Sequence, residues 1–315
     1  MFGKALMRIL VTGAAGFVGR HMIDDLTRHG HEPLALDVAF PDPTLAEPAA
    51  RFTADIRDSA AIEAAFRTAR PDACVHLSAI AFVPDGENRP ETMLSVNIAG
   101  TMILLDTLKR HAPDCKTLVV STAQIYAPQD HESPVAEDAP LAPANLYAVS
   151  KAASDIAALG YARRFGLPLL TARPNNHTGP GQSSSFVVPA LIRQAQAIAA
   201  GRTPPVIHAG NLESQRVFAD VRDVVVAYRL LLEHGAAGEA YNVSAGDNRK
   251  LGAILDRICA MAGIDPSRET DPDKVRPTDR SPVLNTEKIR GQTGWTPRIP
   301  FDQTLRDMLA EDDQP

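Results

Sequence analysis

Cysteine and long apolar runs are scarce in this chain, and each shortage excludes a class of protein. The three cysteines among 315 residues, Cys74, Cys115 and Cys259, are too few and too scattered for a disulfide framework or a metal site. No apolar run approaches the roughly 18 residues that a transmembrane helix needs. An excess of positive charge is missing too, because the formal net charge is -6 at pH 7. That charge favours neither nucleic acid nor an anionic membrane surface as a partner, and we expect a cytoplasmic protein.

The rest of the composition is that of an ordinary folded protein. Hydrophobic residues make up 44% and charged residues 22% of the chain, which is typical of soluble globular domains. A length of 315 residues suits one large domain or two closely packed ones. The apolar residues at the start run directly into a glycine-rich motif, so we interpret them as part of the fold rather than as a signal peptide.

Short apolar segments alternate with longer amphipathic segments in the first half of the chain. We predict strands at residues 8–13, 32–37, 73–79, 116–122 and 167–173, and helices near residues 16–29, 59–69, 91–111 and 147–165. Strands that are apolar on both faces and alternate with helices indicate a parallel sheet that helices cover on both sides. The expected fold class is therefore α/β, with a Rossmann-type doubly wound parallel sheet.

The pattern changes after about Gly179, where proline and glycine become frequent. We predict short strands at residues 216–220 and 239–244, and helices near residues 186–200, 221–233, 250–262 and 302–311. This organisation predicts a dinucleotide-binding domain over residues 1–174 and a smaller, mixed α/β substrate lobe over residues 175–315. Some segments of the second part are expected to return to the main sheet, and the ligand is expected between the two parts.

The first predicted strand ends in TGAAGFVG, which places glycines at positions 13, 16 and 19. Without a Cβ atom, glycine allows a tight turn and the close approach of a pyrophosphate to the N-terminus of the following helix. A glycine triplet alone also fits a plain turn between a strand and a helix. Here a strand precedes the triplet, an amphipathic helix follows it, and a second strand ends in Asp37. Together these features predict a dinucleotide site.

Two carboxylates follow the glycine loop. Asp37 stands about 20 residues beyond the loop, where it would accept hydrogen bonds from the adenosine ribose hydroxyls and repel a 2′-phosphate. We therefore expect NAD(H) as the cofactor rather than NADP(H). Asp55, in FTADIRD, is a candidate contact of the adenine, although a surface turn explains it nearly as well.

The segment NLYAVSK places Tyr147 and Lys151 four positions apart, on one face of a predicted helix. A neighbouring ammonium favours the phenolate, so we expect Lys151 to lower the pKa of Tyr147 and to prepare the phenol for acid–base catalysis. An exposed helix with two unrelated residues would show the same spacing. Thr122 ends the strand predicted at residues 116–122 and can face the same cleft, because ligands meet the carboxyl ends of parallel strands.

Four of these features occur in the order and spacing of a known family. TGAAGFVG, the position of Asp37, VVSTAQIY and YAVSK resemble the extended short-chain dehydrogenase/reductase family, and the resemblance covers essentially the whole chain. It implies that Thr122 binds the substrate oxygen, that Tyr147 transfers a proton, and that Lys151 holds the nicotinamide ribose. The cofactor-binding residues that it implies are Gly13, Gly16, Phe17, Val18, Gly19, Asp37, Asp55, Ile56, Leu77, Ser78, Ala79, Asn97, Tyr147 and Lys151.

The second half narrows the resemblance to the nucleotide-sugar branch of that family. RPNNHTGPGQ, FVVPAL, GNLESQRVFADVRDVVVAY, EAYNVSAG and VRPTDRSPVL are similar to that branch, and the nearest pattern is that of the GDP-4-keto-6-deoxy-D-mannose reductases. It implies that Asn176 contacts a sugar diphosphate and that two arginines hold the phosphates, since guanidinium pairs bidentately with phosphate. The alternative for each arginine is a surface ion pair. The implied substrate-binding residues are Thr122, Gln124, Asn176, Val188, Arg216 and Arg276.

Three positions depart from the family pattern. Asn175 stands where an aromatic residue is usual, Val217 where aspartate is usual, and Ala127 where glycine is usual. The first two put the identity of the sugar in doubt, because both are expected in or near the substrate lobe.

The segment STAQIY separates the possible reactions. The 4,6-dehydratases of the family carry a glutamate at the position of Gln124, whereas Ala123 and Gln124 supply no base for removing a proton next to a carbonyl. We therefore expect NAD(H)-dependent reduction of a nucleotide-linked 4-keto-6-deoxyhexose, GDP-4-keto-6-deoxy-D-mannose to GDP-D-rhamnose if the resemblance holds. The alternatives are a nucleotide-sugar 4-epimerase of the UDP-glucose type, a 4,6-dehydratase, and a non-catalytic NAD-binding regulator.

The remaining candidates have simpler explanations. His76 and His208 lack partners at metal-ligand spacing, so we interpret both as structural. His177 either lines the pocket or packs against it. Asp220 and Asp223 are expected to be a helix cap and a first-turn acid. The resemblance also implies a homodimer, in which the helices near 91–111 and 147–165 pair with their symmetry mates in a four-helix bundle.

Overall fold

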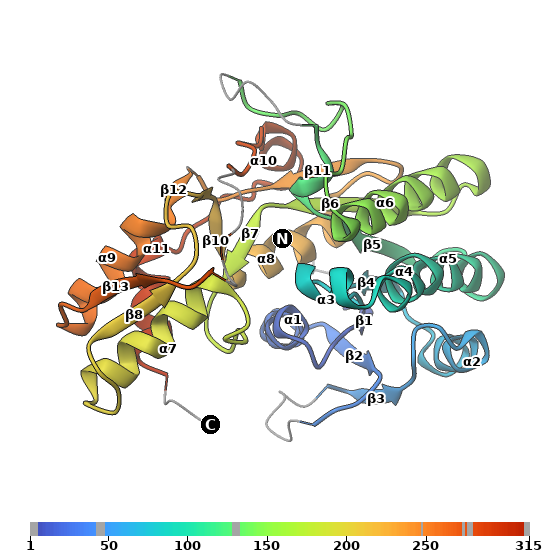
Figure 1. Cartoon of the computed structure of the whole chain (residues 1–315). Helices are drawn as coiled ribbons and strands as arrows, with labels where there is room; N and C mark the ends of the chain where they lie inside the picture. Colours follow the sequence, from blue (N-terminus) through green and yellow to red (C-terminus); the bar gives the residue numbers. More distant parts are fainter. Residues whose placement is uncertain are drawn as a thin grey trace.

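A seven-stranded parallel sheet forms the centre of the molecule (Figure 1). The computed structural model describes residues 6–41, 48–127, 133–246, 248–272, 275 and 280–311. The strand order is β11-β6-β5-β4-β1-β2-β3, and all six neighbouring pairs are parallel. The strands are β1 Arg8–Thr12, β2 Glu32–Asp37, β3 Ala50–Thr53, β4 Ala73–His76, β5 Lys116–Val120, β6 Leu169–Pro174 and β11 Ala240–Val243. The predicted Rossmann-type fold class is confirmed.

Helices cover both faces of this sheet. The strands carry apolar side chains on both faces, and each face forms an apolar cluster with the helices packed on it. The helices α1 (Phe17–Arg28) and α8 (Val221–His234) share one cluster, and α2 (Ser59–Ala69), α5 (Gly100–His111) and α6 (Leu146–Phe165) share the other. In the described stretches, no helix combines the length and the apolar character that a membrane crossing requires.

One predicted helix is wrong in detail. The segment 91–111 is not a single α-helix: α4 (Pro90–Leu94) passes into a π-helical turn, η1 (Ser95–Ala99), before α5 begins. Asn97 lies in this turn and is 1% exposed. Its side chain bonds to Ile80 and Ser150 on neighbouring segments, and such long-range bonds are invisible to helical periodicity. Single π-helical turns often occur at functional sites.

The second lobe packs beside the sheet around an apolar core of its own (Figure 1). Its helices are α7 Val187–Ala199, α9 Leu251–Ala262 and α11 Phe301–Leu309, and its paired strands are β8 Val206–Ala209 with β13 Ser267–Thr270. The segment 216–220, predicted as one strand, divides into β9 (Gln215–Arg216) and β10 (Phe218–Asp220). β9 pairs with β12 (Arg249–Lys250), and β10 pairs with β7 (Asn176–Thr178).

Several short elements escaped the sequence analysis because they lack a clear apolar period. These are β3, β7, β8, β12, β13, α3 (Val83–Asn88), η2 (Ala123–Ile125) and α10 (Glu287–Thr293). Both β11 and α8 come from the second half of the chain yet belong to the main sheet and its covering layer. The predicted domain boundary at residue 174 therefore stays a prediction, and the layers of the fold do not divide at that residue.

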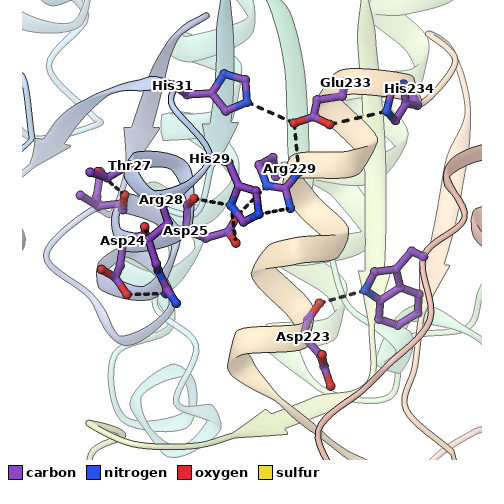
Figure 2. A network of polar contacts seen from close by, with 12 residues as sticks. Asp24, Asp25, Thr27, Arg28, His29, His31, Asp223, Arg229, Glu233 and His234 are labelled. Carbon is purple, nitrogen blue, oxygen red and sulfur yellow. Dashed lines mark hydrogen bonds and ion pairs between the residues drawn. The ribbon is translucent and has the colours of Figure 1, made fainter. Parts of the chain in front are cut away.

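A buried ionic network fixes α1 against α8 (Figure 2). The Arg229 guanidinium donates to Asp25 at 2.8 Å and to Glu233 at 3.1 Å, and all three side chains are 5% exposed. His31 bonds through Nε2 to the same Glu233 carboxylate at 3.1 Å, which ties the start of β2 to α8. Because α1 follows the glycine loop directly, this network holds the helix whose N-terminus faces the predicted pyrophosphate.

Candidate active site

The glycine loop between β1 and α1 packs too closely against neighbouring backbone to admit a side chain at Gly13 or Gly19. Gly13 has a φ of 71°, and a Cβ atom there would lie 2.8 Å from the Ser78 amide nitrogen. A Cβ atom on Gly19 would lie 2.2 Å from the Gly13 carbonyl oxygen, so helix and loop touch backbone to backbone. Gly16 is the N-cap of α1 and provides no side chain to cap the helix amides. The loop therefore fits a dinucleotide pyrophosphate, which such uncapped amides bind.

Asp37 ends β2 directly beside this loop. Its Oδ2 accepts a hydrogen bond from the Ala15 amide at 2.9 Å, and its Oδ1 accepts one from the Val38 amide at 2.7 Å. Each carboxylate oxygen keeps a second lone pair, so the group can still accept from a ribose hydroxyl. The structure thus places Asp37 at the loop, where ribose recognition needs it.

The other residues of the predicted cofactor site surround the same edge of the sheet. Asp55 follows β3, and Arg57 donates to its carboxylate from Nε at 2.9 Å and lowers the pKa of Asp55. Leu77 and Ser78 follow β4, where their amides donate to Thr12. Ile56 is buried against Gly100.

His76 lies at the end of β4 and is buried between two hydroxyls. Its ring nitrogens bond to the Thr12 and Thr101 hydroxyls at 2.8 and 3.0 Å. Burial lowers the pKa of His76 to about 3, so the ring is neutral at physiological pH. Such a residue suits the structural role that the sequence indicated.

The three predicted catalytic residues meet at the carboxyl end of β5. Thr122 is the N-cap of η2, and its Oγ1 accepts from the Gln124 amide at 3.3 Å. Tyr147 and Lys151 lie one turn apart in α6, and a hydrogen bond joins Tyr147 to Thr122. The Ser121 hydroxyl donates to the Lys151 carbonyl oxygen at 3.3 Å, so the end of β5 and α6 are tied together beside the site.

The expected effect of Lys151 on Tyr147 is wrong in this structure. Burial raises the pKa of Tyr147 to about 12, and the hydrogen bond from Thr122 only partly opposes that rise. Burial also lowers the pKa of Lys151 from 10.5 to about 8, against the opposing charge of Asp155. The spacing along the helix indicated that the two groups lie close together. It did not indicate that both groups are removed from solvent, and this burial determines the pKa of Tyr147. The phenol is therefore protonated at neutral pH and able to donate a proton.

Gln124 is held at the start of α6. Its Oε1 accepts from the Asn145 Nδ2 at 3.2 Å, while the Asn145 Oδ1 caps the helix by accepting from the Ala148 amide at 2.8 Å. The Gln124 side chain is thereby oriented as a neutral amide one residue from Ala123 and two from Thr122. An amide has no basic lone pair for carbon acid chemistry, so this corner of the site can bind but not deprotonate.

A buried network below α6 escaped the sequence analysis. Arg173 donates from Nε and Nη2 to Asp155 at 3.1 and 2.7 Å and from Nη1 to the Tyr126 hydroxyl at 3.0 Å. Tyr126 in turn donates to the Asn242 Oδ1 at 2.7 Å. Charged residues inside predicted strands and helices were the available signal: Arg173 is the one charged residue of β6. The network links α6, β6 and β11 beneath the catalytic residues.

Residues 175–181 carry the chain from the sheet to the second lobe across the cofactor loop. Asn176 is half-buried in β7, and the neighbouring His177 ring stacks on Phe17 at 6.3 Å between centroids and 13° between planes. His21 bonds from Nε2 to the Pro180 carbonyl oxygen at 2.8 Å. His177 therefore packs between the two predicted binding regions, and burial lowers its pKa.

Two of the predicted substrate-binding residues, Arg216 and Val188, lie in the second lobe. Arg216 is half-buried in β9, and its Nη1 donates to the Gln215 carbonyl oxygen at 3.1 Å. Val188 is 1% exposed in the core of the lobe, so its backbone rather than its side chain remains available to a ligand. Arg276 lies outside the described residues. The ligand roles of all three stay predictions.

Comparison with known proteins now decides the family. The family described as GDP-mannose 4,6 dehydratase matches residues 10–308. A GDP-6-deoxy-D-mannose reductase from Pseudomonas aeruginosa is 33% identical over an alignment of 309 residues that covers 96% of this chain and 96% of that protein. The chain belongs to the extended short-chain dehydrogenase/reductase family.

Solved structures of that family have the same architecture. The structure of RMD from Pseudomonas aeruginosa complexed with NADPH has a TM-score of 0.83 and 30% identity, covering 96% of this chain and 98% of that one. The UDP-glucose 4-epimerase of Thermus thermophilus complexed with NAD has a TM-score of 0.85 and 30% identity, covering 96% and 97%. This member of the extended short-chain family is thus an NAD(P)-dependent enzyme of the nucleotide-sugar branch.

Proposed function

We propose that this enzyme reduces a nucleotide-linked 4-keto-6-deoxyhexose with NADH, converting GDP-4-keto-6-deoxy-D-mannose to GDP-D-rhamnose. The observation that carries the proposal is the composition of the catalytic corner. Thr122, Tyr147 and Lys151 are together, and the neighbouring Gln124 is a fixed amide rather than a carboxylate. The likeness to the GDP-6-deoxy-D-mannose reductase of Pseudomonas aeruginosa supports guanine as the nucleotide base and a 6-deoxymannose derivative as the sugar.

The state of the phenol suits reduction. A pKa of about 12 keeps Tyr147 protonated at pH 7, so it can donate its proton to the carbonyl oxygen as the alcohol forms. Thr122 binds that same oxygen and is joined to Tyr147 by a hydrogen bond. A bound nicotinamide would supply the hydride that the carbonyl carbon receives. Lys151 lies one helical turn away in α6, where the family resemblance gives it the nicotinamide ribose to hold.

Asp37 favours NADH as the reductant. Its carboxylate lies at the glycine loop, and a 2′-phosphate placed there would meet a like charge. The Pseudomonas aeruginosa structure carries NADPH and the Thermus thermophilus structure carries NAD, so both cofactors occur among the similar proteins. The carboxylate itself is the basis for assigning NADH to this enzyme.

A 4-epimerase is the second candidate, because the Thermus thermophilus relative is one and epimerisation also needs no carbon base. The two reactions differ in cofactor balance. A reductase consumes one NADH for each sugar formed, whereas an epimerase restores its own cofactor within the turnover. Absorbance at 340 nm with GDP-4-keto-6-deoxy-D-mannose and NADH should fall in step with a GDP-6-deoxyhexose product. Interconversion of UDP-glucose and UDP-galactose without added cofactor would instead establish the epimerase.

We also propose that two copies of the enzyme associate through α5 and α6. Val149 and Ile156 lie seven residues apart on one face of α6 and are 41% and 55% exposed. Such a face suits burial against the same helices of a second copy in a four-helix bundle. Light scattering should give the mass of a dimer, and Ile156→Lys should shift it towards the monomer. A monomeric unmodified protein at micromolar concentration would disprove the bundle.

A further inference from the structure

Residues 280–285 form a short segment that begins beside the proposed phosphate-binding strand. Arg280 makes a parallel bridge with Gln215 of β9, the residue next to Arg216. The Ser281 amide donates to the Gln215 carbonyl oxygen at 3.1 Å. The start of the segment is therefore bonded to the strand that carries Arg216.

The same segment ends against the catalytic turn. Leu284 is 6% exposed and packs with Ala123, Tyr126 and Val135 in a small apolar cluster. The Val135 amide donates to the Val283 carbonyl oxygen at 2.7 Å, and the Asn285 amide donates to the Val135 carbonyl oxygen at 2.9 Å. Since Ala123 directly follows Thr122, the segment connects the Arg216 strand to the catalytic corner.

Two asparagines hold the middle of the segment through hydrogen bonds to the backbone carbonyl oxygens of two successive residues. The Asn248 Nδ2 donates to the Ser281 carbonyl oxygen at 2.8 Å, and the Asn175 Nδ2 donates to the Pro282 carbonyl oxygen at 3.1 Å. Asn175 comes directly after β6 and is 4% exposed, whereas Asn248 comes just before β12. The segment is thus fastened to the carboxyl end of β6 and to the second lobe through two adjacent residues.

The stability of the fold does not by itself explain an asparagine at either position. Among the described residues, Asn175 Oδ1 and Asn248 Oδ1 are both buried without a hydrogen-bond partner. A buried acceptor left without a donor is costly, which offsets what each Nδ2 bond contributes. Residues that break a packing rule in this way are expected at functional sites. Their effect is to place the segment rather than to strengthen the fold.

We propose that Asn175 and Asn248 are positioning residues for the sugar diphosphate. By holding residues 280–285, they fix the distance between the Arg216 strand and the catalytic corner at Thr122, so that the diphosphate and the reacting carbonyl bind in register. This rests on the proposed function, because it requires a nucleotide-sugar substrate. It also gives a role to Asn175, the position where an aromatic residue is usual.

The test compares Asn175→Ala and Asn248→Ala with a matched control, Thr171→Val. Thr171 is buried in β6, four residues before Asn175. Its Oγ1 also lacks a hydrogen-bond partner among the described residues, so its side chain forms no hydrogen bond to the segment. Calorimetry on the full-length protein would measure the Kd of GDP, UDP and dTDP. A fluorescence titration would measure the Kd of NADH, and initial rates would give KM and kcat.

We expect each asparagine variant to raise the Kd of the preferred nucleoside diphosphate and the KM of its sugar about three- to ten-fold, the range of one hydrogen bond. The NADH Kd should stay within about two-fold, whereas kcat should fall because the carbonyl is no longer held in register with Thr122. Thr171→Val should change none of these quantities. The double variant should lose less than the product of the single losses, because both residues hold one segment.

An unchanged diphosphate Kd in the folded variants, or an equal loss of NADH affinity, would overturn the inference. If Asn175→Ala does not fold, the less buried Asn248→Ala decides. If the unmodified enzyme binds none of the three diphosphates, the proposed function fails and the inference falls with it. Diphosphate binding without reductase turnover would remove the proposed reaction alone and leave the test of the segment valid.

Discussion

Replacing Lys151 with methionine should make the protein more stable at neutral pH while destroying its activity. Lys151 is 4% exposed, and burial lowers the pKa of its ammonium from 10.5 to about 8. The group titrates at 10.5 when unfolded, so the folded state binds the proton more weakly and protonation favours unfolding. The difference between the two pKa values corresponds to about 3 kcal/mol of destabilisation at pH 7. Asp155 relieves this only in part, because its carboxylate is paired with Arg173.

The pH dependence isolates this charge from the packing of the new side chain. The destabilisation by Lys151 is fully present below pH 8 and disappears as the pH rises through 10.5, whereas methionine does not titrate. The excess stability of Lys151→Met should therefore shrink by about 2 kcal/mol between pH 7 and about pH 9.5. Urea unfolding of both cofactor-free proteins at the two pH values measures it. A difference that stays constant with pH would refute the assignment of a buried, destabilising ammonium.

Three further predictions follow from the site and the core. Tyr147→Phe should reduce turnover by a factor on the order of 10² or more, the usual range for a lost general acid, with NADH affinity unchanged; a fully active variant would refute the mechanism. The unmodified enzyme should bind NADH more tightly than NADPH, and Asp37→Asn should narrow the gap; equal affinities before the substitution would show that the carboxylate does not read the ribose. Tyr228 has a buried hydroxyl without a partner among the described residues, whereas the Tyr126 hydroxyl bonds two groups. Tyr228→Phe should thus leave stability unchanged or raise it by about 1 kcal/mol in urea unfolding, and Tyr126→Phe should lower it by about 1–3 kcal/mol; a larger loss at Tyr228 would contradict this.

Local features of the sequence predicted the main sheet well. The five apolar strands and three of the four amphipathic helices of the first half appear within a few residues of their expected ends, since strand and helix periods are read within one segment. The Asp220 cap and the first-turn position of Asp223 were predicted for the same reason, because capping depends on neighbours in the chain. The short, half-exposed β3 was missed, since its four residues alternate weakly.

The glycine loop and the catalytic spacing could likewise be predicted from the sequence. A Cβ atom on Gly13 or Gly19 would collide with backbone, which is a requirement that only glycine meets. Tyr147 and Lys151 share a helix face because four residues make about one turn. The sequence therefore predicts which side chains lie close together within one helix or loop, before the fold is known.

The tertiary structure decided the properties that depend on distant segments. The pKa of Tyr147 is raised rather than lowered because segments far along the chain exclude water from the phenol, and spacing within one helix cannot report that exclusion. The π-helical turn at Asn97 is held by side-chain bonds to Ile80 and Ser150, 17 and 53 residues away. The joining of the Arg216 strand to the catalytic corner likewise depends on hydrogen bonds between segments far apart in the sequence. The bond from Asn175 to Pro282 spans 107 residues, and only the folded chain brings its two ends together.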